Sequence, residues 1–194
     1  MRRQSEALMP IANSTFLMCT YASSADEEMP HIAMIAGPLD TTKPVLVRIH
    51  SECLTGDLFG SKRCDCGEQL SKSLDLIAAQ KGVLIYLRQE GRGIGLINKL
   101  KAYQLQDKGL NTADANLHLG FDVDSREYEI AFQILLELGV KQIDLLTNSP
   151  RKISAFEDSG IEINKRIPLI IDAKPENKNY LDTKKNLMGH LLDI

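Results

Sequence analysis

Residues 48–67 read RIHSECLTGDLFGSKRCDCG and contain three of the four cysteines of the chain, Cys53, Cys64 and Cys66. Ten residues separate the first thiol from the second, and one residue separates the second from the third. Three thiolates without an obvious fourth protein ligand are typical of a catalytic zinc site, which keeps one coordination position for water. Soft sulfur ligands favour zinc over magnesium or manganese. We therefore predict a zinc ion that lowers the pKa of a bound water to about 7 and so activates it.

Two other interpretations of the three thiols stay open at this stage. They could be small residues of the hydrophobic core, although the neighbouring Lys62, Arg63 and Asp65 are charged and do not favour a core position. Alternatively, His50 could be a fourth ligand, which would close the site and make it structural. The remaining cysteine, Cys19, lies inside the apolar run 16–21, where we expect plain packing.

Short apolar runs before and after this stretch predict β-strands. Turn-forming residues bound these runs, and the third run, which leads into the cysteines, alternates β-branched with polar residues. The predicted strands cover residues 16–21, 31–36, 44–50, 83–87 and 143–147, with an extended segment at 161–171.

Apolar residues at helical spacing, each set followed by a glycine, predict helices between the later strands. The helices are expected at 67–81, at 96–108, behind a capping box at 124–127 that ends at Gly139, and from Pro150 to Gly160. Residues 111–124 have no clean period and are expected to be loop. The prediction is a mixed α/β (α+β) fold: a β-rich N-terminal part and then alternating helices and strands. It forms one compact domain over residues 1–171, to which the polar tail 172–194 belongs.

Charge and hydropathy restrict the class of partner. A net charge of −3 and a pI near 5.8 argue against a general nucleic-acid binder, which needs a basic surface. No run approaches the ~18 apolar residues of a membrane span. No apolar run follows Arg2 and Arg3, as a secretory signal requires. We expect a cytoplasmic protein without nucleic-acid or membrane partners, whose cysteines are thiols or metal ligands rather than disulfides.

Several motifs, in order along nearly the whole chain, resemble GTP cyclohydrolase II, the enzyme that opens riboflavin biosynthesis. The motifs are residues 48–57, 63–67, RQEGRGIGL at 88–96, LTNSP at 146–150, YLDTK at 180–184 and MGH at 188–190. The family usually has a glycine before an aromatic residue near the N-terminus, where this chain has Ser14-Thr15-Phe16. This difference lies at the edge of a predicted strand and not among the residues that would act in the reaction. Some relatives carry a fused dihydroxybutanone-phosphate synthase domain upstream, for which we see no room, so we expect the stand-alone form.

The resemblance implies a zinc hydrolase that opens the imidazole ring of GTP. It would release C8 as formate and the outer two phosphates as diphosphate, leaving 2,5-diamino-6-(5-phosphoribosylamino)pyrimidin-4-one. One Zn²⁺ per subunit on Cys53, Cys64 and Cys66, Mg²⁺ with the nucleotide phosphates, and a homodimer are implied as well. GTP contacts are implied at Arg48, Ile49, His50, Ser51, Glu52, Gln69, Glu90, Gly91, Arg92, Thr112, Thr147 and Lys152.

Three residues receive catalytic roles from the resemblance. Tyr103 matches the residue of the ring-opening step, and Asp124 and Arg126 match a proposed base and a nucleophile toward the α-phosphate. Residue chemistry alone predicts plainer roles: aromatic packing for Tyr103 and a helix cap for Asp124. Since a guanidinium keeps its proton up to a pKa above about 12, Arg126 would be a poor nucleophile. A clamp on developing phosphate charge is its alternative role.

Other functions make different predictions. A non-catalytic, zinc-stabilised nucleotide-binding protein would have a closed site with four protein ligands. A hydrolase that stops at the formamidopyrimidine product is disfavoured by the presence of Tyr103. A zinc deaminase of free bases is disfavoured because its His-x-Glu and Pro-Cys-x-x-Cys signature is missing.

Overall fold

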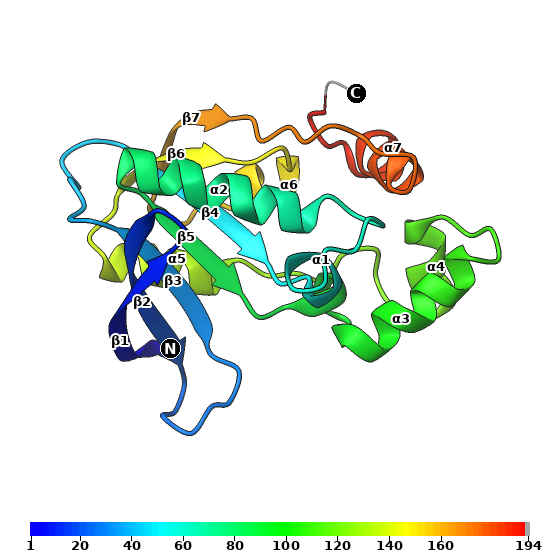
Figure 1. The fold of residues 1–194 in the computed structure, drawn as a ribbon, viewed down its shortest axis with the longest axis horizontal. Coiled ribbons are helices and arrows are strands. Elements are labelled where there is room, and N and C mark those ends of the chain that lie inside the picture. Colours follow the sequence, from blue (N-terminus) through cyan, green and yellow to red (C-terminus); the bar gives the residue numbers. More distant parts are fainter. Residues whose placement is uncertain (193–194) are drawn as a thin grey trace. The chain divides into compact units, whose positions relative to one another are not determined.

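The computed structural model describes residues 1–192, and Figure 1 shows its fold. The chain divides into two compact units assembled from interleaved segments. The first unit comprises Met1–His50, Ser71–Arg88 and Tyr128–Leu169. The second comprises Ser51–Leu70, Gln89–Glu127 and the chain from Ile170 onward.

A mixed sheet of seven strands, in the order β1-β2-β3-β5-β4-β6-β7, forms the first unit. The antiparallel strands β1 to β3 make up one side of the sheet, and β4, β6 and β7 run parallel on the other. The strands are β1 (Arg2–Ile11), β2 (Ser14–Ala22), β3 (His31–Ala36), β4 (Val45–Ser51), β5 (Val83–Leu87), β6 (Gln142–Leu146) and β7 (Glu162–Ile167). All predicted strands are confirmed within a few residues, and the mixed α/β class with them. Strand β1 lies outside the segments that the sequence predicts, since its exposed, polar positions give little hydrophobic signal.

The core of this unit lies between one face of the sheet and helix α5 (Glu129–Glu137). Figure 1 shows α5 behind the strands and α2 (Cys66–Gln80) in front of them. Apolar residues of β4, β5, β6 and α5 fill the core: Val45, Val47, Ile49, Val83, Ile85, Leu87, Ile143, Leu145, Ala131, Phe132, Ile134 and Leu135. Cys19 is fully buried in the same core, as predicted. Because side chains alternate along a strand, Arg48 and His50 of β4 face away from it.

Helix α2 ends where the sequence predicts, but the roles of its last residues differ from the prediction. Lys81 takes the left-handed conformation (φ +54°) that usually favours glycine. Gly82 instead permits close approach, since a Cβ there would overlap the carbonyl oxygen of Leu46 in β4. The glycine is therefore required by packing between β4 and the start of β5.

Short helices make up the second unit. They are α1 (Leu54–Asp57), the 3₁₀ turn η1 (Glu90–Gly93), α3 (Gly95–Gln106), α4 (Thr112–His118) and α7 (Lys178–Met188). Helix α4 packs against α3 and α7. Helix α6 (Pro150–Ser154) belongs to the first unit and begins with Pro150, as predicted.

The prediction that residues 111–124 form a loop is wrong, because α4 lies inside this range. The Asn111 side chain accepts a hydrogen bond from the Asp114 amide and caps the helix. The buried face consists of the small residues Ala113 and Ala115 with Asn116. A helix of this length and composition has almost no hydrophobic period, so only the capping asparagine indicated it.

The part of the chain that the structure describes contains no helix long and apolar enough to cross a membrane.

Candidate metal and nucleotide site

The three cysteines of the opening stretch come together in the second unit. Their sulfur atoms all lie within 4.8 Å of one another, and Cys53 Sγ and Cys64 Sγ are 3.7 Å apart. Cys53 and Cys64 are buried and Cys66 is half-buried. Within residues 1–192 the group of potential metal ligands consists of these three residues and does not include His50.

Local geometry of the chain creates this cluster. Cys53 precedes the single turn α1, and the Asp57 carboxylate accepts a hydrogen bond from the Cys53 amide at 2.9 Å. Gly56 lies beneath the sulfurs: a Cβ there would lie 2.9 Å from Cys64 Sγ and 3.2 Å from Cys53 Sγ. Cys66 is the first residue of α2. The glycine thus leaves the space in which the three sulfurs converge.

The donor set fits a zinc ion. Tetrahedral coordination with Zn–S bonds of about 2.3 Å places sulfur atoms roughly 3.8 Å apart, close to the observed 3.7 Å. A disulfide would need about 2.05 Å between two sulfurs, and all the cysteines are free. Hydrogen bonds with Cys64 and Cys66, together with the nearby Lys99 ammonium, hold the pKa of Cys53 well below its usual value. The hydrogen bond with Cys53 raises the pKa of Cys64 to about 11.

Two charged residues, Lys99 and Glu90, lie close to the three thiols, and the sequence does not predict this proximity. Lys99 Nζ of α3 donates to Cys53 Sγ at 3.1 Å and to Glu90 Oε1 at 2.7 Å. Glu90 Oε2 in turn accepts from the amide of Leu54, the residue after Cys53. The sequence predicts Glu90 as a nucleotide contact, whereas Lys99 carried no signal beyond its place in a helix.

Tyr103 lies one helical turn after Lys99 in α3. The Lys99 ammonium is 5.8 Å from the centre of its ring, and the Arg63 guanidinium lies 4.9 Å from the same point. Burial raises the pKa of the Tyr103 hydroxyl, so at neutral pH this group is a proton donor. The side chain is therefore placed beside the thiol cluster by the same helix that places Lys99.

Asp124 and Arg126 form a close ion pair, which corrects the predicted capping box. Arg126 donates to the Asp124 carboxylate from Nε at 2.8 Å, from Nη2 at 2.6 Å and from its own amide at 3.2 Å. Helix α5 begins at Glu129 with Tyr128 as its N-cap, so Asp124 caps no helix. The bidentate carboxylate–guanidinium geometry of this pair fixes the orientation of both side chains.

The glycine-rich turn η1 has an unusual backbone conformation. Gly91 and Arg92 both adopt positive φ, +64° and +62°, which is uncommon for arginine. Arg92 Nη1 donates weakly to the Val123 carbonyl at 3.4 Å, and its buried Nη2 has no hydrogen-bond partner among residues 1–192. Because most buried polar groups have a partner, this nitrogen is free to donate to one from outside the chain, such as an ordered water or an anion.

The other residues of the second unit that are predicted to contact the nucleotide lie in several different segments. Ser51 Oγ accepts from Gln89 Nε2 at 2.9 Å, and Glu52 is buried. Gln69 donates to the Asp65 carboxylate, and Thr112 is the first residue of α4.

Five predicted contacts, Arg48, Ile49, His50, Thr147 and Lys152, belong to the first unit. Arg48 Nη1 donates to the Leu146 carbonyl at 3.0 Å, and Lys152 Nζ donates to the Ile49 carbonyl at 2.6 Å. Both cations therefore lie at the carboxyl ends of the parallel strands β4 and β6. In open α/β sheets this edge is the usual ligand position. The His50 ring stacks on Tyr86 of β5, with 5.5 Å between ring centres.

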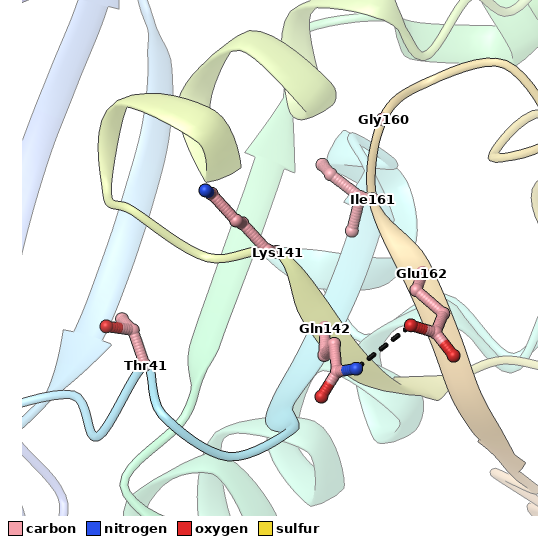
Figure 2. Close-up of a pocket in the computed structure, with 6 residues that line it drawn as sticks. All are labelled: Thr41, Lys141, Gln142, Gly160, Ile161 and Glu162. Carbon is pink, nitrogen blue, oxygen red and sulfur yellow. Dashed lines mark hydrogen bonds between the residues drawn. The ribbon is translucent and has the colours of Figure 1, made fainter.

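A pocket of about 580 Å³ in the first unit contains none of the predicted residues. It is lined by Thr41, Lys141, Gln142, Gly160, Ile161 and Glu162. Figure 2 shows Gln142 and Glu162 joined by a hydrogen bond of 2.9 Å across the first residues of β6 and β7. This pocket lies at the amino ends of the parallel strands, the opposite edge from Arg48 and Lys152.

Comparison with known proteins agrees with the predicted resemblance. Residues 2–168 match the model of the GTP cyclohydrolase II family. Riboflavin biosynthesis protein RibBA of Bacillus cereus is 52% identical over 193 residues, covering 99% of this chain and 48% of that protein. The same values hold for RibBA of Bacillus mycoides and of Bacillus cytotoxicus. The chain thus spans about half the length of these relatives.

A solved structure also resembles the chain, though more distantly. RibBX of A. baumannii, described as a two-domain 3,4-dihydroxy-2-butanone 4-phosphate synthase, aligns with a TM-score of 0.45 and 19% identity. The alignment covers 88% of this chain and 40% of that one.

Proposed function

Because the chain belongs to the GTP cyclohydrolase II family, we propose that it hydrolyses GTP in the first step of riboflavin biosynthesis. One water breaks the C8–N9 bond of guanine, a second releases C8 as formate, and a third separates diphosphate from the α-phosphate. The product is 2,5-diamino-6-(5-phosphoribosylamino)pyrimidin-4-one. The observation that carries this proposal is the three-sulfur cluster, in which the distance of 3.7 Å between Cys53 Sγ and Cys64 Sγ suits tetrahedral zinc.

Cys53, Cys64 and Cys66 are the residues that would hold the zinc ion. A bound zinc ion would supply Lewis-acid activation of water at neutral pH, which attack at C8 requires. In this proposal the Tyr103 hydroxyl, whose pKa burial raises further above neutrality, donates a proton to a ring nitrogen. Burial of Cys53 and Cys64 limits the access of bulk water to the sulfurs.

Arg126 acts, in this proposal, on the α-phosphate. Asp124 holds its guanidinium through two side-chain hydrogen bonds, at 2.8 and 2.6 Å. A guanidinium held in this way keeps its positive charge, which suits stabilisation of developing phosphate charge better than nucleophilic attack. We therefore assign Arg126 the role of a charge clamp and Asp124 the role of orienting it.

Nucleotide binding is proposed for the other residues that match the family motifs. In the second unit these are Ser51, Glu52, Gln69, Glu90, Gly91, Arg92 and Thr112. Among them, the buried Arg92 Nη2 without a protein partner is the observation that favours an anionic ligand. In the first unit, Arg48 and Lys152 supply positive charge at the carboxyl ends of β4 and β6, beside Ile49, His50 and Thr147. Mg²⁺ is expected to accompany the phosphates, since these oxygens are its preferred ligands.

A homodimer and a cytoplasmic location complete the proposal. Both rest on the membership of the GTP cyclohydrolase II family.

Incubation of the purified protein with GTP and Mg²⁺, before and after zinc removal with a chelator, tests the proposal. We expect one formate and one diphosphate per GTP consumed, and loss of both on chelation with recovery when Zn²⁺ returns. Cys64→Ser should abolish zinc binding and activity, whereas Cys19→Ser, in the core of the first unit, should leave the metal content unchanged. GTP consumption without formate would point to the formamidopyrimidine product, and binding without turnover would point to a non-catalytic nucleotide-binding protein.

A further inference from the structure

One buried lysine has no role in the function proposed so far. Lys99 is 8% exposed, and lysine is almost never buried unless it is paired. Its ammonium group donates to Cys53 Sγ at 3.1 Å and to Glu90 Oε1 at 2.7 Å. Gly91 makes room for this side chain, because a Cβ at position 91 would lie 3.1 Å from Lys99 Cβ.

Glu90 holds the ammonium group in this place. Its Oε1 also accepts from the Gly91 amide at 2.6 Å, and its Oε2 accepts from the Leu54 amide. Two backbone donors therefore fix the carboxylate, and the carboxylate fixes the lysine. The arrangement connects the Leu54 backbone, the turn η1 and helix α3 through buried charged groups.

We propose that Lys99 is a positioning residue of the metal centre, whose hydrogen bond to the Cys53 thiolate withdraws charge from that sulfur and sets its donor strength toward the metal. This inference rests on the proposed function only in requiring that the three sulfurs bind a metal. Three thiolates and one divalent zinc ion carry a net charge of −1, which opposes Lewis-acid activation. An ammonium group in contact with one sulfur offsets part of this charge. Groups that hydrogen-bond to metal ligands commonly tune metal sites in this way.

Cobalt(II) binding to the full-length protein tests the proposal without reference to turnover. Its thiolate-to-metal charge-transfer band reports the donor strength of the sulfurs. In Lys99→Met the band should move to longer wavelength, because the Cys53 sulfur keeps the charge that the ammonium group withdraws in the parent protein. Lys101→Met is the matched control, because Lys101 is an exposed lysine two residues later in the same helix, and it should behave like the parent protein. An unshifted band in Lys99→Met overturns the proposal.

A second pair of variants separates charge tuning from misfolding. Lys99→Met leaves the buried Glu90 carboxylate without its cation, so Lys99→Met/Glu90→Gln removes both charges together. We expect the double variant to fold and to show the same band shift, and Lys99→Arg, which keeps the charge and the donors, to return the band toward its original position. A double variant with the band of the parent protein would again overturn the role of Lys99. If the parent protein itself binds cobalt without a thiolate band, the zinc site of the proposed function fails, which is a different result.

Discussion

Gly67, near the start of α2, packs directly against the backbone of Gly56 beneath the thiol cluster: a Cβ on Gly67 would overlap the Gly56 carbonyl oxygen. A Cβ on Gly56 would in turn crowd the sulfurs of Cys53 and Cys64. The two glycines therefore set the distance between the turn that carries Cys53 and the helix that carries Cys66. The convergence of the three sulfurs therefore depends on this backbone contact as well as on the positions of the cysteines in the sequence.

Gly67→Ala tests this contact, because two effects predict opposite signs. Helix propensity favours alanine over glycine by roughly 1 kcal/mol, and Gly67 has no positive φ to prevent the change. Steric overlap with a backbone atom costs more, typically 1–3 kcal/mol for an overpacked site. We expect a net loss of up to about 2 kcal/mol in the free energy of unfolding and less than one zinc per chain, measured by urea unfolding and metal analysis.

Ser71→Ala is the control for the propensity effect, since Ser71 is exposed in the same helix. It should stabilise the protein slightly and leave the zinc content unchanged. A Gly67→Ala protein that is more stable than the parent and binds a full equivalent of zinc would show that close contact with Gly56 is needed neither for stability nor for zinc binding.

The sequence was most informative where its pattern and its chemistry were local. The strands, the helix at 67–81 and the approach of Cys53, Cys64 and Cys66 follow from periodicity and from ligand spacing, and the structure confirms them. Helix α4 was missed because its buried residues are small and give no period. The role of Asp124 was misassigned because Asp124 and Glu127 have the spacing of a capping box, whereas the carboxylate pairs with Arg126, two residues along the chain.

Contacts between distant segments lay beyond sequence reasoning. Lys99 and Cys53 are separated by 46 positions, and nothing in a helical pattern distinguishes a lysine that donates to a sulfur from a solvated one. The same holds for Lys184 and Asp65, which are 119 positions apart. Such pairs need the fold before their chemistry can be recognised.

Zinc removal should loosen one unit more than the other. All three sulfur ligands belong to the second unit, whereas the sheet and its core belong to the first. After chelation we expect faster amide hydrogen exchange in α1, at the start of α2 and in α3, with β3 and β5 little changed. Hydrogen exchange followed by mass spectrometry measures this difference. An equal increase in the central strands would mean that the metal stabilises the whole chain as one cooperative unit.

The role of Arg126 can be tested with Arg126→Lys. Lysine keeps the charge but cannot reproduce the two side-chain hydrogen bonds to Asp124. For a charge clamp we expect kcat to fall by roughly 10²- to 10³-fold with a smaller change in KM, and no covalent nucleotide on the parent protein. Intact-mass spectrometry of protein quenched during turnover decides the second point. A guanylyl adduct on Arg126 would contradict the clamp and restore the nucleophile.

His31 gives the stability of the protein a predictable pH dependence. Its Nδ1 accepts a hydrogen bond from the Arg88 amide at 3.0 Å, and burial lowers its pKa, with Arg88 lowering it further and Glu27 opposing both. The unfolded chain therefore binds a proton more readily than the folded protein. Stability from the neutral imidazole is fully present above pH 6.5 and is lost as the pH falls through the lower pKa of the folded state.

His31→Asn keeps an acceptor near the position of Nδ1 but removes the titration. Between pH 7.5 and 5 we expect its free energy of unfolding, from urea titrations, to fall less steeply than that of the parent protein. His118→Asn, at an exposed position in α4, should follow the parent slope. Parallel slopes for the parent and His31→Asn would assign the acid sensitivity to other groups.

Two ion pairs connect the C-terminal segment to the region of the thiols, and they should differ greatly in energy. Asp65, between Cys64 and Cys66, pairs with Lys184 of α7 at 2.8 Å, and the side chains are 2% and 12% exposed. Lys174 pairs with Glu68 at 2.7 Å, but these side chains are 39% and 47% exposed. Lys184→Met leaves a buried carboxylate without its cation and should cost about 3–5 kcal/mol. Lys174→Met, the matched control, should cost less than about 1 kcal/mol.

The double variant Asp65→Asn/Lys184→Met separates two contributions to this cost. One is the loss of the attraction between Asp65 and Lys184, and the other is the penalty for a buried Asp65 carboxylate without a cation. If most of the cost comes from the uncompensated Asp65 carboxylate, the double variant should be clearly more stable than Lys184→Met, because neither charge remains. Gln69, which also donates to Asp65, can still donate to the amide oxygen of the asparagine. Urea unfolding of the single and double variants gives the coupling energy directly. A double variant as unstable as Lys184→Met would mean that the pair, rather than the desolvated carboxylate, keeps α7 against the loop of the zinc ligands.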